Sequence, residues 1–89
     1  METRDVMIKR LSMRSMRRGI KEMDLILSDF ASQSLTAMDE ADLTLYDKLL
    51  SENDHDLFSW TNGQSAPPEL YSGLIKSIQD GAFGLTRPN

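Results

Sequence analysis

The spacing of apolar side chains is the feature of this sequence that most restricts its fold. Met23, Ile26, Leu27 and Phe30 recur at intervals of three and four residues, which places them on one face of an α-helix. The same spacing recurs in four further segments: Val6, Met7, Leu11 and Met16; Leu43, Tyr46, Leu49 and Leu50; Leu57, Phe58 and Trp60; and Leu74, Ile75 and Ile78, preceded by Leu70 or Tyr71. The chain holds a single valine, and no segment alternates apolar and polar residues as a half-buried strand does. The sequence therefore predicts an all-α fold.

Residues that typically start and stop helices divide the chain into short elements. Start signals stand at Thr36 with Asp39, at Asn53 or Asp54, and at Pro67-Pro68, whereas stop signals stand at Asn62-Gly63 and Gly81. A chain of 89 residues has the length of one domain, which buries about 60–65% of its unfolded surface. We expect a single compact bundle of about five short helices over residues 1–82 and a flexible C-terminal tail over residues 83–89.

Several kinds of chemical site lack the residues that they require. The absence of cysteine excludes disulfides, cysteine-ligated zinc and thiol chemistry. His55, the one histidine, lies in an acidic stretch that reads as a helix start, and no glycine-rich phosphate loop occurs. No apolar run approaches the roughly 20 residues of a membrane span, so no membrane insertion is expected. We predict no catalytic residue, no metal site and no cofactor-binding site, and therefore a protein that is not an enzyme.

Charge is distributed unevenly along the chain. Residues 1–24 carry seven basic and four acidic side chains, whereas residues 25–89 carry three basic and ten acidic ones. The basic segment can face an acidic or phosphate-bearing partner, or it can pair with the acidic remainder of its own domain. A small basic-helix module that binds nucleic acid or has a regulatory role is an alternative. The acidic isoelectric point of about 4.8 argues against nucleic acid as the partner, and Glu2 and Asp5 argue against a targeting peptide.

Gly19 stands in a dense charge cluster between two predicted helices. It can end the first helix in a left-handed cap, or its missing side chain can let another backbone approach closely, and the two roles are compatible. Arg18 and Glu22, four residues apart, can form an ordinary surface ion pair. Leu25 is expected to point outward if the apolar face of its helix points inward. This mixture of apolar and charged residues is typical of a protein interface, and its members are Arg14, Arg17, Arg18, Gly19, Glu22, Asp24 and Leu25.

Two motifs of the sequence, and the start of its last helix, resemble parts of a known family. Arg18-Gly19-x-x-Glu22-x-Asp24 is similar to the Arg-Gly-x-x-Glu motif of the succinate dehydrogenase FAD assembly factors, also called flavinylation factors, and Arg10 and Arg14 stand upstream as in bacterial members. Asp54-x-Asp56-Leu57-Phe58-x-Trp60 resembles a second family segment, and Pro67-Pro68-Glu69-Leu70 resembles the start of its last helix. The resemblance covers residues 8–78, and His55 replaces the usual proline.

The resemblance implies a five-helix protein that promotes covalent attachment of FAD to the flavoprotein subunit of succinate dehydrogenase and, in some bacteria, of fumarate reductase. In this family the FAD belongs to the flavoprotein, and the factor is not thought to supply catalytic groups. The family's contact with the flavoprotein corresponds here to Arg18, Gly19 and Glu22. The likeness to bacterial members implies a cytoplasmic protein, and we expect it to be a monomer.

Overall fold

Five α-helices and two single-turn 3₁₀ helices follow one another in the computed structural model, which describes the backbone of residues 2–86 and the side chains of residues 2–81. They are α1 (Arg4–Arg14), α2 (Lys21–Ser34), η1 (Leu35–Ala37), α3 (Glu40–Leu49), α4 (Asp54–Thr61), η2 (Glu69–Tyr71) and α5 (Ser72–Thr86). No strand occurs between residues 2 and 86. The predicted all-α fold of about five helices is confirmed.

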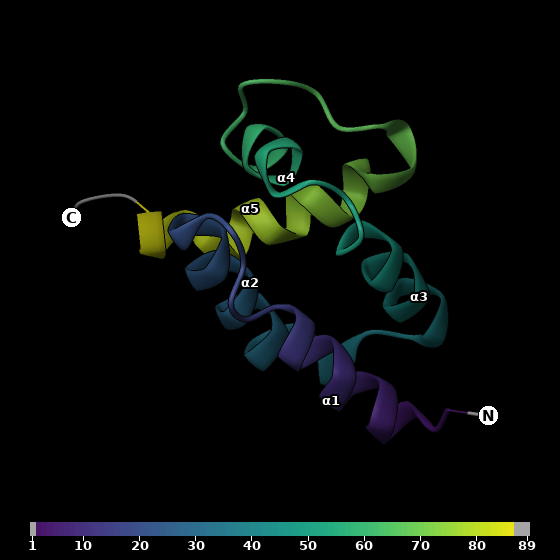
Figure 1. The fold of residues 1–89 in the computed structure, drawn as a ribbon. Coiled ribbons are helices and arrows are strands. Elements are labelled where there is room, and N and C mark those ends of the chain that lie inside the picture. Colours follow the sequence, from purple (N-terminus) through teal and green to yellow (C-terminus); the bar gives the residue numbers. More distant parts are fainter. Residues whose placement is uncertain (1, 87–89) are drawn as a thin grey trace.

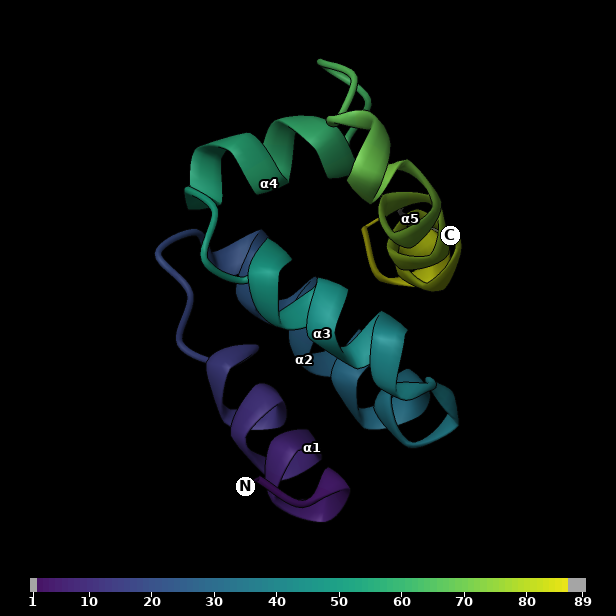
Figure 2. The ribbon, with the colours of Figure 1, turned by 90° about the vertical axis from the view of Figure 1, so that its right-hand side faces the viewer.

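The helices are arranged around the packed pair α2 and α5 (Figure 1). Helix α1 lies along α2 and α3, and α4 packs on both α2 and α5. Figure 2 shows that the connection between α1 and α2 lies on the same side of the molecule as the start of α4. Segments far apart in the sequence therefore meet at this edge, which is where the candidate site lies.

The core is built from the apolar face of each helix. On α2 the predicted stripe of Met23, Ile26, Leu27 and Phe30 is buried. The other buried apolar residues are Leu11, Ala31, Leu35, Leu43, Tyr46, Leu49, Leu50, Leu57, Tyr71, Ile75 and Ile78, while Phe58, Trp60 and Leu74 pack against them partly buried. Helical periodicity therefore predicts most of the core, because burial within a helix follows its repeat.

Three residues of the predicted apolar stripes are exposed instead. Val6 and Met16 are each at least half exposed, because the start of α1 extends beyond the core and Met16 lies after the end of that helix. Of the pair Leu70 and Tyr71, the tyrosine is buried and the leucine is exposed. The inclusion of Val6 and Met16 in the buried face was therefore wrong.

Side-chain caps fix the starts of three helices. Thr3 accepts a hydrogen bond from the Val6 amide at 3.2 Å, and Asn53 caps α4 by accepting one from the His55 amide at 2.8 Å. Asp39 caps α3, whereas Thr36 lies within η1, so the predicted start at Thr36 was three residues early. Each of these oxygens satisfies an amide that has no partner within its own helix.

The last helix is longer than predicted. Helix α5 continues through Gly81 to Thr86, so the expected helix end at Gly81 is wrong. A glycine inside a helix is tolerated at a cost of about 1 kcal/mol. Of the predicted tail over residues 83–89, residues 83–86 belong to α5, and residues 87–89 lie outside the described part of the chain. None of the described helices has the length and apolar character needed to cross a membrane.

Candidate functional site

The candidate site is the connection between α1 and α2, residues 15–20, together with the first turns of α2. Helix α1 ends at Arg14, and its C-cap is Ser15. Arg17 has a φ of 58°, whereas Gly19 is not in the left-handed region, so the predicted left-handed cap at Gly19 is wrong. The backbone amide of Arg17 donates to Oδ1 of Asp24 at 2.9 Å, which holds this unusual conformation.

Arg18 turns its side chain into the molecule, where it is 12% exposed. Its Nε donates to Oδ1 of Asp54 at 2.8 Å, and Nη2 approaches the same oxygen to 2.7 Å. Its guanidinium also donates to two backbone carbonyl oxygens, those of Arg14 at 3.0 Å and Leu50 at 3.1 Å. Arg18 thus joins the end of α1 to the segment between α3 and α4, and the surface ion pair with Glu22 that its spacing allowed does not form.

Gly19 is required here because Asp54 lies directly over it. The Gly19 amide donates to Oδ2 of Asp54 at 2.7 Å. A Cβ atom added at Gly19 would lie 2.9 Å from that same oxygen, closer than real Cβ contacts. The close approach predicted for Gly19 therefore exists, but its partner is a carboxylate of the same chain. We call Arg18, Gly19 and Asp54 the Asp54 clamp.

A second ion-pair cluster fastens α1 to α3. Arg10 donates to both carboxylate oxygens of Asp47, at 2.9 and 3.0 Å, and to Glu2 at 2.7 Å. Arg14 also binds Asp47 and donates to the Ser51 hydroxyl at 3.1 Å. The Arg10 hydrogen bond holds the pKa of the Asp47 carboxyl below its usual value. At Arg10, Arg14 and Arg18, the interpretation that the basic segment pairs with acids of its own domain is confirmed.

A buried hydroxyl pair lies beneath this cluster. Ser15 is fully buried and donates to the Leu11 carbonyl at 2.8 Å, which leaves its oxygen to accept a hydrogen bond from the Tyr46 hydroxyl at 2.5 Å. Burial raises the pKa of Tyr46 to about 12. The hydroxyl therefore keeps its proton to a higher pH than an exposed tyrosine does, and its hydrogen bond connects α3 to the end of α1.

The remaining residues of the predicted surface are exposed. Glu22 and Leu25 both lie on the outside of α2, and Leu25 is 52% exposed, as predicted. Glu22 and Asp24 lie in the first turn of α2, where the helix dipole favours acids. Within residues 2–81, no hydrogen bond or ion pair is formed by the side chains of Arg17, Lys21 or Glu22. We call Lys21, Glu22 and Leu25 the α2 face, since spacings of three and four place them side by side.

The structure thus divides the seven predicted partner-binding residues into two groups. Arg14, Arg18 and Asp24 use polar groups of their side chains within the chain. The other four, Arg17, Gly19, Glu22 and Leu25, are exposed beside them. Partner binding by these residues stays a prediction.

The acids that bind the arginines were missed by sequence reasoning. The excess of acids after residue 24 indicated internal pairing, but it did not single out Asp47 or Asp54 among ten candidates. Asp54 was assigned as a helix start, and it does lie in the first turn of α4. A signal was present, because Arg18 and Asp54 belong to the two motif segments, yet 36 residues separate them and no periodicity connects them.

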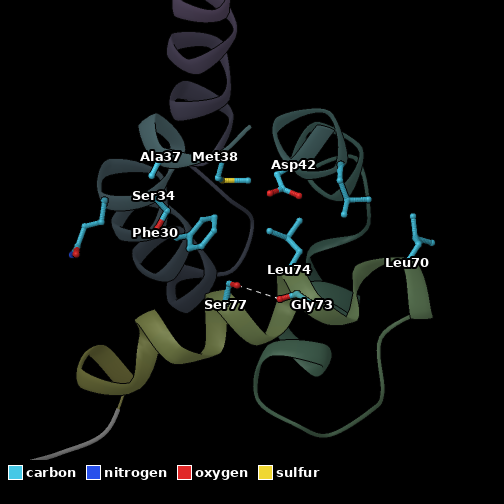
Figure 3. A pocket seen from close by; sticks show the side chains of 11 residues that line it. Phe30, Ser34, Ala37, Met38, Asp42, Leu70, Gly73, Leu74 and Ser77 are labelled. Carbon is cyan, nitrogen blue, oxygen red and sulfur yellow. Dashed lines mark hydrogen bonds between the residues drawn. The ribbon is translucent and has the colours of Figure 1, made fainter. Parts of the chain in front are cut away.

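A groove of about 530 Å³ lies on another side of the molecule, between α2, α3 and α5 (Figure 3). Its lining is Phe30, Gln33, Ser34, Ala37, Met38, Asp42, Leu45, Leu70, Gly73, Leu74 and Ser77. Asp42 is the one charged residue in this lining, and it is an acid, so the groove is poorly suited to a phosphate group. No group of three or more potential metal-ligating side chains is brought together among the described residues.

Comparison with known proteins identifies the family. Residues 9–82 match the model of a family described as flavinator of succinate dehydrogenase. This segment includes the Asp54 clamp, the α2 face and all of α2, α3 and α4. The chain therefore belongs to the succinate dehydrogenase flavinator family, and the resemblance found in its motifs is confirmed.

Three relatives that the chain matches carry the name succinate dehydrogenase assembly factor 2, mitochondrial. The Schizosaccharomyces pombe protein is 44% identical over 70 residues, which cover 79% of this chain and 50% of that protein. The Danio rerio protein is 40% identical over 79 residues, which cover 86% of this chain and 50% of that protein. The protein of Saccharomyces cerevisiae strain S288c is 42% identical over 76 residues, which cover 80% of this chain and 47% of that protein. The chain thus spans about half the length of the relatives it matches.

Proposed function

We propose that this chain promotes covalent attachment of FAD to the flavoprotein subunit of succinate dehydrogenase, and in some organisms of fumarate reductase. The observation that carries the proposal is the match of residues 9–82 to the flavinator family. The chain would bind the immature subunit and stabilise the conformer in which FAD and its acceptor histidine are in reacting geometry. A binder shifts such an equilibrium through its differential affinity for the two conformers.

In this proposal the chain is not an enzyme, and the FAD belongs to the flavoprotein. Correct placement of two reacting groups can contribute about 7–11 kcal/mol toward a barrier, so the factor needs no catalytic group of its own. The acidic and apolar lining of the groove between α2, α3 and α5 supports this assignment, because an FAD diphosphate would meet the Asp42 carboxylate there. We expect a monomer that acts in the cytoplasm.

The proposed contact is the exposed part of the candidate site. The α2 face combines a base, an acid and an exposed leucine, the mixed chemistry of a protein interface. Gly19 is exposed next to it and presents backbone to a partner. Arg17 extends the charged surface toward acidic groups of the flavoprotein. Arg14, Arg18 and Asp24 would support this surface from beneath, since their polar groups are bonded within the chain.

The nucleic-acid alternative is disfavoured by the ion pairs of the basic segment. Arg10, Arg14 and Arg18 each bind a carboxylate of the same chain, which removes three of the seven basic groups from a phosphate-binding surface. Nucleic-acid affinity depends on cations that can replace the counterions of phosphates. The distribution of charge therefore supports a protein partner.

Co-expression tests the proposed function. The flavoprotein subunit is produced with and without this chain, and covalent FAD is detected by in-gel fluorescence under denaturing conditions. We expect fluorescence to depend on the chain and to fall with Glu22→Ala, while Gln33→Ala, a change on the far end of α2, serves as the matched control. Equal fluorescence with and without the chain would contradict the proposal.

A further inference from the structure

Asp54 joins the two motif segments of the chain through both of its carboxylate oxygens. Oδ1 accepts from the Arg18 guanidinium, and Oδ2 accepts from the Gly19 amide. The Asp54 side chain is 23% exposed, so these bonds are partly shielded from water. Charge-assisted hydrogen bonds of this kind are stronger than neutral ones. One residue at the start of α4 therefore holds the chain just before α2.

The first turn of α2 lacks a side-chain cap of its own. Its N-cap residue is Ile20, which makes no capping hydrogen bond, in contrast to Thr3, Asp39 and Asn53 at α1, α3 and α4. A helix start without a cap is expected to fray unless other contacts hold it. The Gly19 amide is held by Asp54, one residue before that N-cap. The orientation of this turn thus depends on a contact from α4.

The same turn carries the exposed residues of the candidate site. Lys21 and Glu22 lie in it, and Leu25 follows one turn later. We propose that Asp54 is a positioning residue, which fixes Gly19 and the α2 face in the orientation that binds the partner. This inference rests on the proposed function, because it assigns the α2 face to the flavoprotein contact.

Asp56 provides a matched control for Asp54. Both acids lie in the first turn of α4, so both interact with the dipole of that helix. Asp56 is exposed, and its carboxylate makes no hydrogen bond or ion pair with the described side chains. Replacing Asp56 therefore removes the same charge from the same turn without releasing Arg18 or Gly19. Asn53 caps α4 in the unaltered chain, and we expect it to do so in either variant because its own side chain is unchanged.

The test combines amide exchange in the isolated chain with affinity for the purified flavoprotein subunit. In Asp54→Ala we expect faster hydrogen exchange at the Gly19 amide and a dissociation constant about tenfold higher, a loss of about 1.4 kcal/mol. In Asp56→Ala we expect both quantities to stay at their original values. Asp54→Asn, which keeps the shape of the side chain, gives the same comparison if Asp54→Ala is not folded at the temperature used.

A double-mutant cycle separates positioning from a general structural role. If Asp54 acts through the α2 face, Glu22→Ala weakens binding less in the Asp54→Ala background than in the unaltered chain. Additive losses, or unchanged affinity in folded Asp54→Ala, would overturn this inference alone. Failure of the unaltered chain to bind the flavoprotein would overturn the proposed function and the inference with it.

Discussion

Arg17 and Gly19 have exchanged the roles that their residue types suggest. The arginine adopts the left-handed backbone conformation, whereas the glycine keeps an ordinary one and is needed for space. A non-glycine residue in the left-handed region costs about 1–2 kcal/mol. The bond from the Arg17 amide to Asp24 offsets part of that cost. The connection is therefore strained at one residue and crowded two residues later.

Replacing Arg17 with glycine is expected to stabilise the fold. The relief of about 1–2 kcal/mol of strain exceeds the roughly 0.5–1 kcal/mol that glycine adds through the entropy of the unfolded chain. Urea unfolding followed by circular dichroism should show a rise of about 0.5–1 kcal/mol in the free energy of unfolding. Met16→Gly is the control, since Met16 is outside the left-handed region and should lose stability. A stability loss in Arg17→Gly would contradict the strain argument.

Replacing Gly19 with alanine is expected to destabilise the fold by about 1–3 kcal/mol, the range for an overpacked site. The added methyl group would displace the Asp54 carboxylate, which is held by Arg18 and cannot move without losing those bonds. Gly81→Ala is the control of opposite sign, because nothing lies within 4 Å of a Cβ there and alanine favours the helix. Thermal unfolding of both variants measures the contrast, and equal shifts would refute it.

At the scale of elements, Asp47 holds α1 against α3. Arg10 lowers the pKa of the Asp47 carboxyl in the folded chain. The ionised carboxylate therefore contributes stability at pH values above 3.8, the pKa of this carboxyl in the unfolded chain. That contribution is lost as the pH falls through the folded value, which lies lower. Between pH 7 and pH 2, the free energy of unfolding should therefore fall more steeply in the unaltered chain than in Asp47→Asn. Urea unfolding at several pH values gives both curves, and parallel curves would show that Asp47 makes no such contribution. Glu2, whose pKa Arg10 also lowers, remains in both proteins.

The helices could be predicted from the sequence, whereas the contacts between them could not. Apolar spacing is a local signal, and it located α2 and its buried face of Met23, Ile26, Leu27 and Phe30. Ion pairing between distant segments has no such period, so the excess of acids predicted pairing without naming Asp54. The end of α5 was missed because glycine often ends a helix, whereas its preference against a helix interior is weak and α5 continues through Gly81.

For the candidate site, the sequence predicted the exposure of several residues correctly, but the orientation of one arginine was wrong. Gly19, Glu22 and Leu25 are exposed as expected. Arg18 was read as an outward arginine, yet it binds a carboxylate and two carbonyl oxygens within the chain. The direction of a long side chain in a connection depends on tertiary partners, and sequence spacing within one segment carries no information about them.

At the scale of the whole molecule, two tyrosines connect separate parts of the fold. Tyr46 reaches Ser15 at the end of α1, and the Tyr71 hydroxyl donates to Glu52, between α3 and α4, at 2.7 Å. Burial raises the pKa of both hydroxyls to about 12. The sequence contains no other tyrosine, so an absorbance titration reports on these two alone.

Alkaline conditions are expected to unfold the protein cooperatively. Above pH 10.0, the ordinary pKa of tyrosine, the tyrosines of the unfolded chain ionise while those of the folded chain stay protonated. The contribution of these two groups to the free energy of unfolding should therefore be fully present and constant below pH 10. It should fall progressively between pH 10 and 12. Absorbance near 295 nm and Trp60 fluorescence should change together, since the Trp60 and Tyr71 ring centroids are 5.9 Å apart. If both tyrosines ionised near pH 10 while Trp60 fluorescence showed an intact fold, this expectation would be contradicted.

The double use of the Asp54 carboxylate also restricts how such sequences can diverge. A chain that loses this acid leaves the shielded Arg18 without its counterion. It also removes the carboxylate that would clash with a side chain at position 19. We therefore expect natural variants that change position 54 to change positions 18 and 19 as well, although position 54 lies on α4 and the other two lie in the connection before α2. The two regions would then be inherited as one evolutionary unit.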